Sequence, residues 1–89
     1  MESVIRVFPR DDFTLELWFS TGDYRLFDMK PYLNRGVFTK LKDLTQFKRA
    51  YVCFDTVCWP DNLDIAPETL FDRSVPLTKL EKGSTPLKN

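Results

Sequence analysis

The stretch Tyr51–Phe71, YVCFDTVCWPDNLDIAPETLF, decides the fold of this chain. Two short apolar segments lie at its start: Ala50–Phe54, which begins one residue before the stretch, and Val57–Trp59. The polar pair Asp55-Thr56 separates these two segments, which is typical of a β-hairpin with a two-residue turn. The opening of the stretch therefore predicts two antiparallel strands.

The second half of the same stretch predicts a helix. Pro60 ends the preceding strand, because proline has no N–H to give to a ladder. Asp64–Glu68 then leads into a last helical turn, in which Pro67 suits the first helical position. Glu68 is favourable near the positive end of that helix.

Upstream of this stretch, the first part of the chain predicts a three-stranded meander. Phe13–Ser20 alternates apolar and polar residues, which indicates a strand with one buried face. Val4–Phe8 precedes it, and Tyr24–Met29 follows after a turn in which Gly22 takes a positive φ.

The middle of the chain has a helical period. Apolar residues between Pro31 and Phe47 recur at spacings of three and four, and Gly36 interrupts them. We expect a short turn over residues 31–34, a helix from about Val37 to Asp43, and a loop before Phe47.

With 89 residues the chain supports one domain. We expect an α+β domain over residues 1–73, with a small antiparallel sheet, formed by the meander and the hairpin, and one or two short helices. Residues 74–89 are rich in proline, glycine and serine, which predicts a flexible tail. The alternative is that Val75, Leu77 and Leu80 dock on the sheet or on a partner.

Charge is balanced overall but uneven along the chain. Thirteen basic and thirteen acidic residues cancel, so the molecule as a whole does not attract nucleic acid or an anionic membrane. Residues 30–50 nevertheless hold one acidic residue, Asp43, and six basic residues: Lys30, Arg35, Lys40, Lys42, Lys48 and Arg49. Residues 51–73 hold one basic and five acidic residues. We expect the two segments to neutralise each other; the alternative is a bipolar surface that orients a protein partner.

The two cysteines are predicted to face each other. A turn at Asp55-Thr56 would place Cys53 opposite Cys58, where a disulfide is geometrically conceivable. Because a disulfide does not normally persist in a reducing cytoplasm, we expect two buried thiols that pack as small hydrophobic groups.

No residue cluster predicts catalysis, a cofactor or a metal. The chain has no histidine, which excludes nucleophiles that depend on an imidazole base within the chain. Its three glycines are too far apart for a phosphate-binding loop. We therefore expect no enzymatic activity. Neither a membrane span of about 18 apolar residues nor a signal peptide is visible, so we expect a cytoplasmic protein.

Trp18 is the most conspicuous aromatic residue, because the alternation places it opposite the buried face of its strand. Either a helix covers that side, or Trp18 is exposed beside Phe8 and Phe27 and forms an interaction surface. We expect the covered arrangement.

Residues 3–72 resemble the bacterial family of domains of unknown function named DUF2442. The residues that match are Asp28, Pro31, Gly36, Val37, Phe38, Leu41, Asp43, Phe47, Val52, Trp59, Pro60, Asp64, Ile65, Pro67, Glu68, Leu70 and Phe71. Asn62-Leu63 stands where glycine and a small residue are usual, and Phe71 where tyrosine is common. The resemblance implies a small α+β domain without catalytic residues. It also implies relatives fused to a helix-turn-helix, or paired with a small neighbour in a toxin and antitoxin arrangement.

These observations favour a non-catalytic protein-interaction module, an antitoxin-like or regulatory member of a two-protein pair. The residues expected to contact a protein partner are Trp18, Arg35, Lys40, Lys42, Lys48 and Arg49. A homodimer through sheet edges is also compatible with so small a sheet. Two alternatives stay open: a component of a nucleic-acid-associated regulator, and a small-ligand-binding domain.

Overall fold

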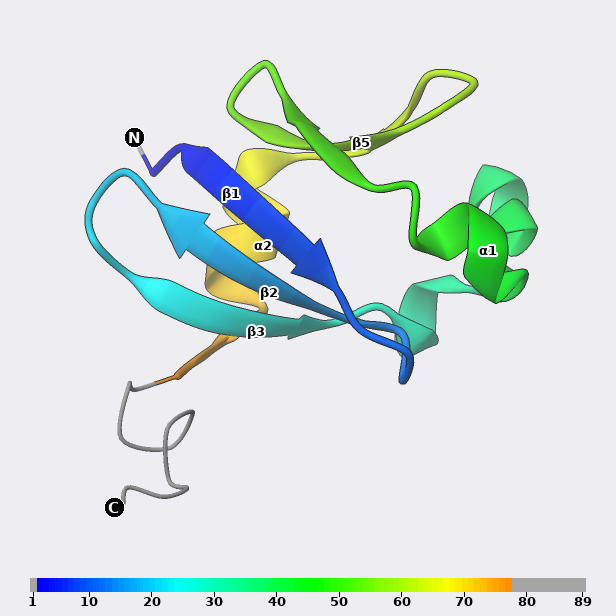
Figure 1. Cartoon of the computed structure of the whole chain (residues 1–89), viewed down its shortest axis with the longest axis horizontal. Coiled ribbons are helices and arrows are strands. Elements are labelled where there is room, and N and C mark those ends of the chain that lie inside the picture. The colour runs from blue at the N-terminus through cyan, green and yellow to red at the C-terminus, as the bar shows by residue number, and fades with distance from the viewer. Residues whose placement is uncertain (1, 78–89) are drawn as a thin grey trace.

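The computed structural model describes residues 2–77 and contains two antiparallel sheets with a few short helices (Figure 1). The first sheet has four strands in the order β1-β2-β3-β7: β1 (Val4–Pro9), β2 (Thr14–Phe19), β3 (Tyr24–Asp28) and β7 (Val75–Pro76). The second has three strands in the order β4-β5-β6: β4 (Tyr51–Cys53), β5 (Thr56–Trp59) and β6 (Leu63–Ile65). The α+β class is confirmed, but the predicted single sheet is divided into two.

The meander β1-β2-β3 is confirmed, and its alternation sets the two faces of the first sheet. Leu15, Leu17 and Phe19 of β2 are buried on the inner face. The register places Arg6 opposite Trp18, and Trp18 opposite Tyr24, on the other face. A bulge between Val4 and Arg6 keeps Val4 turned into the core.

The first sheet gains a fourth strand from the segment we predicted as a tail. Val75 and Pro76 pair with Leu26 and Arg25 of β3. The domain therefore extends beyond the boundary predicted at residue 73. The sequence did not predict this strand, because two residues are too few to show an alternating pattern and their pairing depends on tertiary contacts. Residues 78–89 of the predicted tail lie outside the described residues.

The second sheet corrects the predicted hairpin register. The turn lies at Phe54-Asp55, so that Cys53 faces Thr56 and Val52 faces Val57. Both turn residues have positive φ, 50° and 69°, as a type I′ turn requires. Because the pairing shifts by two residues, Cys53 and Cys58 stay on one face of the hairpin but lie diagonally rather than directly opposite each other.

Strand β6 (Leu63–Ile65) was not predicted, since Asp64–Glu68 was assigned to the approach to the last helix. Asp61 and Asn62 both adopt positive φ and turn the chain back along β5. Asparagine tolerates this conformation, so the departure at Asn62 from the glycine usual in the resembling family leaves the turn intact.

The helices are short, and the second of them, Gly36–Lys42, lies close to the segment that the helical period predicted as a helix. They are η1 (Lys30–Tyr32), η2 (Gly36–Lys42), α1 (Leu44–Phe47) and α2 (Pro67–Asp72), of which η1 and η2 are 3-10 helices. The segment before Phe47, expected to be a loop, is the single turn α1, capped by the Asp43 side chain that accepts a hydrogen bond from the Thr45 N–H. Within residues 2–77 no helix has the length and hydropathy needed to cross a membrane.

The core lies between the inner face of the first sheet, the second sheet and α2 (Figure 1). Trp59 is its largest fully buried side chain. The other members with the least exposure are Phe19, Phe27, Phe47, Leu15, Leu17, Met29, Leu41, Leu70, Val4 and Val57. In Figure 1 α2 is seen behind β1 and β2, so the opposite face of the first sheet looks toward the viewer.

Candidate protein-interaction surface

The face of the first sheet that points away from α2 carries a row of stacked side chains. We call it the sheet outer face and define it by Arg6, Phe8, Glu16, Trp18, Tyr24 and Leu26, which are cross-strand neighbours in the register. The Arg6 guanidinium lies 4.5 Å from the centre of the Trp18 ring. Trp18 stacks in turn on Tyr24, with ring centres 4.8 Å apart and planes inclined by 25°. Cross-strand pairs thus align one cation and two aromatic rings.

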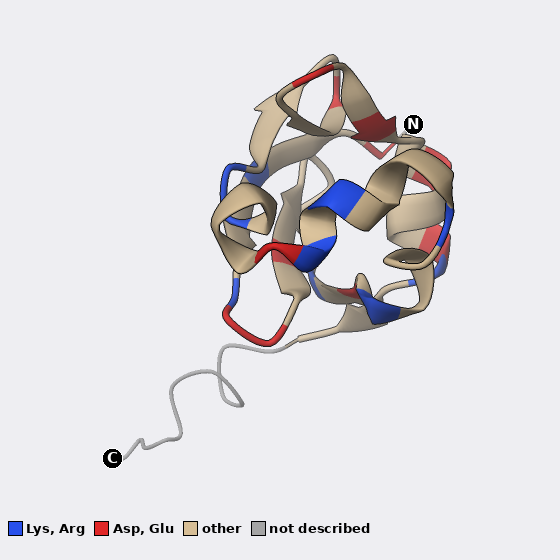
Figure 2. Ribbon diagram, turned by 90° about the vertical axis from the view of Figure 1, so that its right-hand side faces the viewer, with Lys and Arg blue, Asp and Glu red and all other residues tan. Residues whose placement is uncertain are grey.

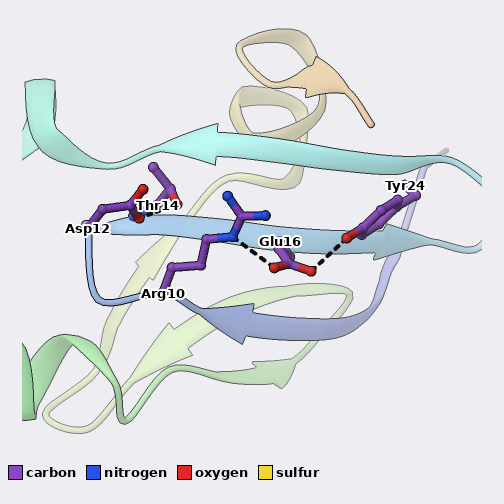
Figure 3. A network of polar contacts seen from close by, with 5 residues as sticks. All are labelled: Arg10, Asp12, Thr14, Glu16 and Tyr24. Carbon is purple, nitrogen blue, oxygen red and sulfur yellow. Dashed lines mark hydrogen bonds and ion pairs between the residues drawn. The ribbon is translucent and has the colours of Figure 1, made fainter. Parts of the chain in front are cut away.

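A hydrogen-bonded network beside this row fixes the polar side chains of the face (Figure 3). The Glu16 carboxylate accepts a hydrogen bond from Arg10 Nε at 2.8 Å and one from the Tyr24 hydroxyl at 2.7 Å. Burial, together with the hydrogen bond to Glu16, raises the pKa of Tyr24 to about 12. The hydrogen bond to Glu16 also raises the pKa of Arg10. The network keeps Tyr24 neutral and Arg10 charged.

A second polar contact shapes the turn between β1 and β2 (Figure 3). Asp12 accepts hydrogen bonds from the Thr14 hydroxyl at 2.6 Å and from the Thr14 N–H at 3.2 Å. The hydroxyl bond holds the pKa of Asp12 below its usual value. Phe13, which lies between Asp12 and Thr14, takes a φ of 65°. The centres of the Phe13 and Phe47 rings are 5.2 Å apart. The turn between β1 and β2 is therefore fixed by the Asp12–Thr14 hydrogen bonds and by the packing of Phe13 on Phe47.

Apolar side chains complete the surface. Phe8 is 51% exposed, and Val75, next to Leu26 in the register, is 56% exposed. Arg6, Phe8, Glu16 and Trp18 line a shallow hollow of about 240 Å³. The sheet outer face therefore combines exposed apolar groups, a cation and an ordered carboxylate in one place.

Comparison with protein families matches residues 4–76 to the family described as "Protein of unknown function (DUF2442)". This match covers most of the 89 residues. The chain belongs to the DUF2442 family. Searches among curated proteins and among solved structures find no match.

Of the contact residues predicted from the sequence, this DUF2442 domain brings only Trp18 to the sheet outer face. The expectation that a helix covers Trp18 is wrong, because α2 packs on the other face of the sheet. Phe8 is its neighbour as anticipated. Phe27 is not, since it is buried on the inner face and stacks on Tyr32.

The five predicted basic residues are dispersed over the end of the DUF2442 domain formed by η2 and α1 (Figure 2). Four of the five have a partner within the domain. The Arg35 guanidinium lies 4.9 Å from the centre of the Tyr32 ring, and Arg49 donates a hydrogen bond to Gln46. Lys40 and Lys48 form ion pairs with Asp61 at 3.7 Å and with Asp11 at 2.6 Å. For Lys42 the structure describes an exposed side chain. In Figure 2 the basic segments stand apart and acidic ones lie among them.

The two oppositely charged segments neutralise each other only in part. Among the ion pairs of residues 2–77, Lys40–Asp61 alone connects them. Lys48 and Lys30 use Asp11 and Asp28, which lie outside the acidic segment. The sequence reasoning counted charges along the chain, whereas the pairing depends on which turns lie together in space.

The sequence reasoning missed Arg6, Arg10, Glu16 and Tyr24. A signal was present: positions 16 and 18 share the polar side of the alternating strand, and their neighbours across a meander follow from its two turns. In the described part of the chain no group of three or more metal-ligating side chains is found.

The cysteine prediction is corrected by the structure. Cys53 and Cys58 form a disulfide with Cα atoms 6.0 Å apart, in place of the two thiols we expected. Their diagonal positions lie on the same face of β4 and β5, within the range that a disulfide spans.

Proposed function

We propose that this DUF2442 domain is a non-catalytic protein-interaction module whose contact surface is the sheet outer face. The observation that carries the proposal is the stacked row Arg6–Trp18–Tyr24 beside the half-exposed Phe8. Trp, Tyr and Arg are the residue types that dominate the binding energy of protein interfaces. A row of three such side chains on one face is a concentration that the packing of the core does not require.

The surface is ordered before a partner arrives. Arg10 and Tyr24 are both held on Glu16, and Trp18 lies between Arg6 and Tyr24. Binding then loses less side-chain entropy than it would on a mobile surface. This pre-organisation supports a rigid contact face.

The chemistry of the face also supports a particular kind of partner. Arg10 is neutralised by Glu16, whereas Arg6 forms no ion pair with any residue of the described range. The partner we propose is a protein with an apolar patch for Phe8 and Trp18 and a carboxylate opposite Arg6. Such a contact fits the regulatory or antitoxin-like member of a two-protein pair, which masks a partner and releases it.

The test uses the product of the neighbouring gene as the candidate partner. The two proteins are co-expressed and purified, and the dissociation constant is measured by calorimetry for the wild type, Trp18→Ala, Arg6→Ala and the control Val37→Ala. Val37 is 63% exposed on η2, away from the proposed contact. We expect Trp18→Ala to weaken binding at least about tenfold, as hot-spot truncations do. Equal affinity for Trp18→Ala and Val37→Ala contradicts the proposed surface.

The alternative of a nucleic-acid-associated regulator is less favoured, because the basic residues at the η2–α1 end have local partners. Electrostatic binding to phosphates weakens steeply with salt. We expect no retention on duplex DNA at moderate ionic strength, measured by fluorescence anisotropy. Salt-dependent retention that Lys42→Ala and Arg49→Ala reduce would favour the alternative.

A further inference from the structure

A second hollow lies on the outer face of the three-stranded sheet. Tyr51, Cys58 and Asp64 are opposite one another in the register of β4, β5 and β6, so their side chains share this face. Val52, Val57 and Ile65 form the neighbouring row, whose side chains point to the core. The Cys53–Cys58 disulfide crosses the same face diagonally.

The hollow has the size of one side chain. Its volume is about 160 Å³, and its lining includes Tyr51, Cys53, Phe54, Cys58, Asn62 and Asp64. An apolar cavity of about 150 Å³ suffices to hold a benzene molecule. Besides the buried Trp59 and Leu63, the lining supplies the rings of Tyr51 and Phe54 and the disulfide as apolar walls, and one amide and one carboxylate as polar groups.

The carboxylate decides the charge of the occupant. Asp64 is exposed at the hollow and has no ion pair with any residue between 2 and 77. Tyr51, 48% exposed, stands in the same cross-strand row. An aromatic face beside a carboxylate attracts a cation from both sides, through the ring quadrupole and through direct charge.

Phe54 has properties that the fold alone leaves unexplained. Its side chain is 94% exposed, although it is among the largest apolar groups in the chain. Its φ of 50° is unfavourable for a bulky residue and suits glycine or asparagine. The side chain adds nothing to the core and the backbone is strained, a combination that points to a role in binding.

We propose that this hollow binds a single arginine side chain of a protein partner. The guanidinium lies against the Tyr51 ring and pairs with Asp64, while the apolar stem of the arginine lies along the disulfide and under Phe54. Arginine fits better than lysine, because its planar fork stacks on aromatic rings and binds a carboxylate with two parallel hydrogen bonds. This site lies on a different sheet from the sheet outer face, and it stands or falls independently of the proposed function.

The test is a titration of the isotope-labelled full-length chain, in its disulfide form, followed by two-dimensional NMR. The probe is the peptide acetyl-Gly-Arg-Gly-amide, and the matched control replaces its arginine with citrulline, which has the same shape without the charge. We expect saturable shifts of the amides of Tyr51, Cys53, Asn62 and Asp64 with the arginine peptide alone.

Two variants complete the design. Asp64→Asn removes the carboxylate from an exposed strand position, and Asp72→Asn makes the same change on α2, outside the hollow. We expect Asp64→Asn to weaken binding about fivefold or more, and Asp72→Asn to leave it unchanged. The proposal is overturned if no saturable shift occurs up to the solubility of the peptide, if citrulline binds equally well, or if the two variants behave alike.

Discussion

The indole Nε1 of Trp59 donates a hydrogen bond to the carbonyl of Phe47 over 2.8 Å, which joins β5 to the end of α1. Both side chains are fully buried, and their rings lie 6.2 Å apart. Sequence reasoning placed the two residues in separate elements, and the bond shows that the second sheet and the helical end of the molecule are one packed unit.

Replacement of Trp59 by Phe should therefore destabilise the fold. The change removes the indole N–H and leaves part of its space empty, while the Phe47 carbonyl keeps only the long bond from the Ala50 N–H at 3.3 Å. We expect a loss of about 1 to 3 kcal/mol in the free energy of unfolding, measured by urea denaturation. An unchanged midpoint would show that the bond contributes nothing.

Reduction of the Cys53–Cys58 disulfide should lower stability modestly. The bond closes a short loop of sequence separation 5. The chain-entropy estimate for so short a loop is about 2 kcal/mol. Denaturation with and without a reductant measures the loss, and the double variant Cys53→Ala, Cys58→Ala provides the control, because it should be insensitive to the reductant. Two thiols that react rapidly in the native protein without reductant would contradict the bond.

Stability should fall at high pH through Tyr24. Its pKa is about 10 in the unfolded chain and about 12 in the folded protein, so the fold favours the neutral phenol. The contribution is complete below pH 10 and is lost as the pH rises from 10 toward 12. Thermal unfolding of the wild type and of Tyr24→Phe across this range measures the effect. The phenylalanine variant should lose less stability with rising pH, and parallel curves would contradict the assignment.

Replacement of Phe54 by Asn should stabilise the fold. Phe54 has a left-handed backbone conformation, which costs a non-glycine residue about 1 to 2 kcal/mol, and asparagine tolerates it better. Little burial is lost, because the side chain is 94% exposed. We expect a gain of up to about 1 kcal/mol in denaturant unfolding. A destabilised variant would mean that the aromatic ring packs on the fold.

The residues that follow α2 should be required for stability. Arg25 lies over the Phe71 ring at 4.5 Å and donates to the Ser74 hydroxyl at 2.6 Å and the Ser74 carbonyl at 2.7 Å. A stop codon after Arg73 removes both acceptors, and we expect a loss of at least about 2 kcal/mol. A stop codon after Leu77 is the control, since it keeps every described strand. Equal stability of the two truncated chains would refute a structural role for residues 74–77.

The alternation of β2 and the helical period after Pro31 were sufficient to predict the meander and the helical segment, because burial on one side imposes a period on the sequence. Strand β7 could not be predicted in this way, since two residues have no period and their pairing depends on Arg25 and Ser74 meeting in space. The hairpin register failed for a related reason. The turn places Phe54 where glycine or asparagine is usual, so the local signal pointed one residue too far.

The candidate sites were predictable only where a single strand determined them. Trp18 followed from the alternation of its own strand. Glu16 shares the polar side of the same strand, whereas Arg6 and Tyr24 join it through the register across the two turns, which no single segment encodes. The groups lining the second hollow needed the disulfide, the strand β6 and an unusual turn together.

The position of β7 also affects how this chain is made. It is the last strand in the described chain, yet it covers the edge of β3, an early strand. While the ribosome is still adding residues, that edge has no partner, and open edges pair with whatever strand is near. Stable closure of the first sheet must therefore await the synthesis of Val75 and Pro76. An unfinished chain that lacks these two residues leaves Arg25 and Leu26 without their strand partner.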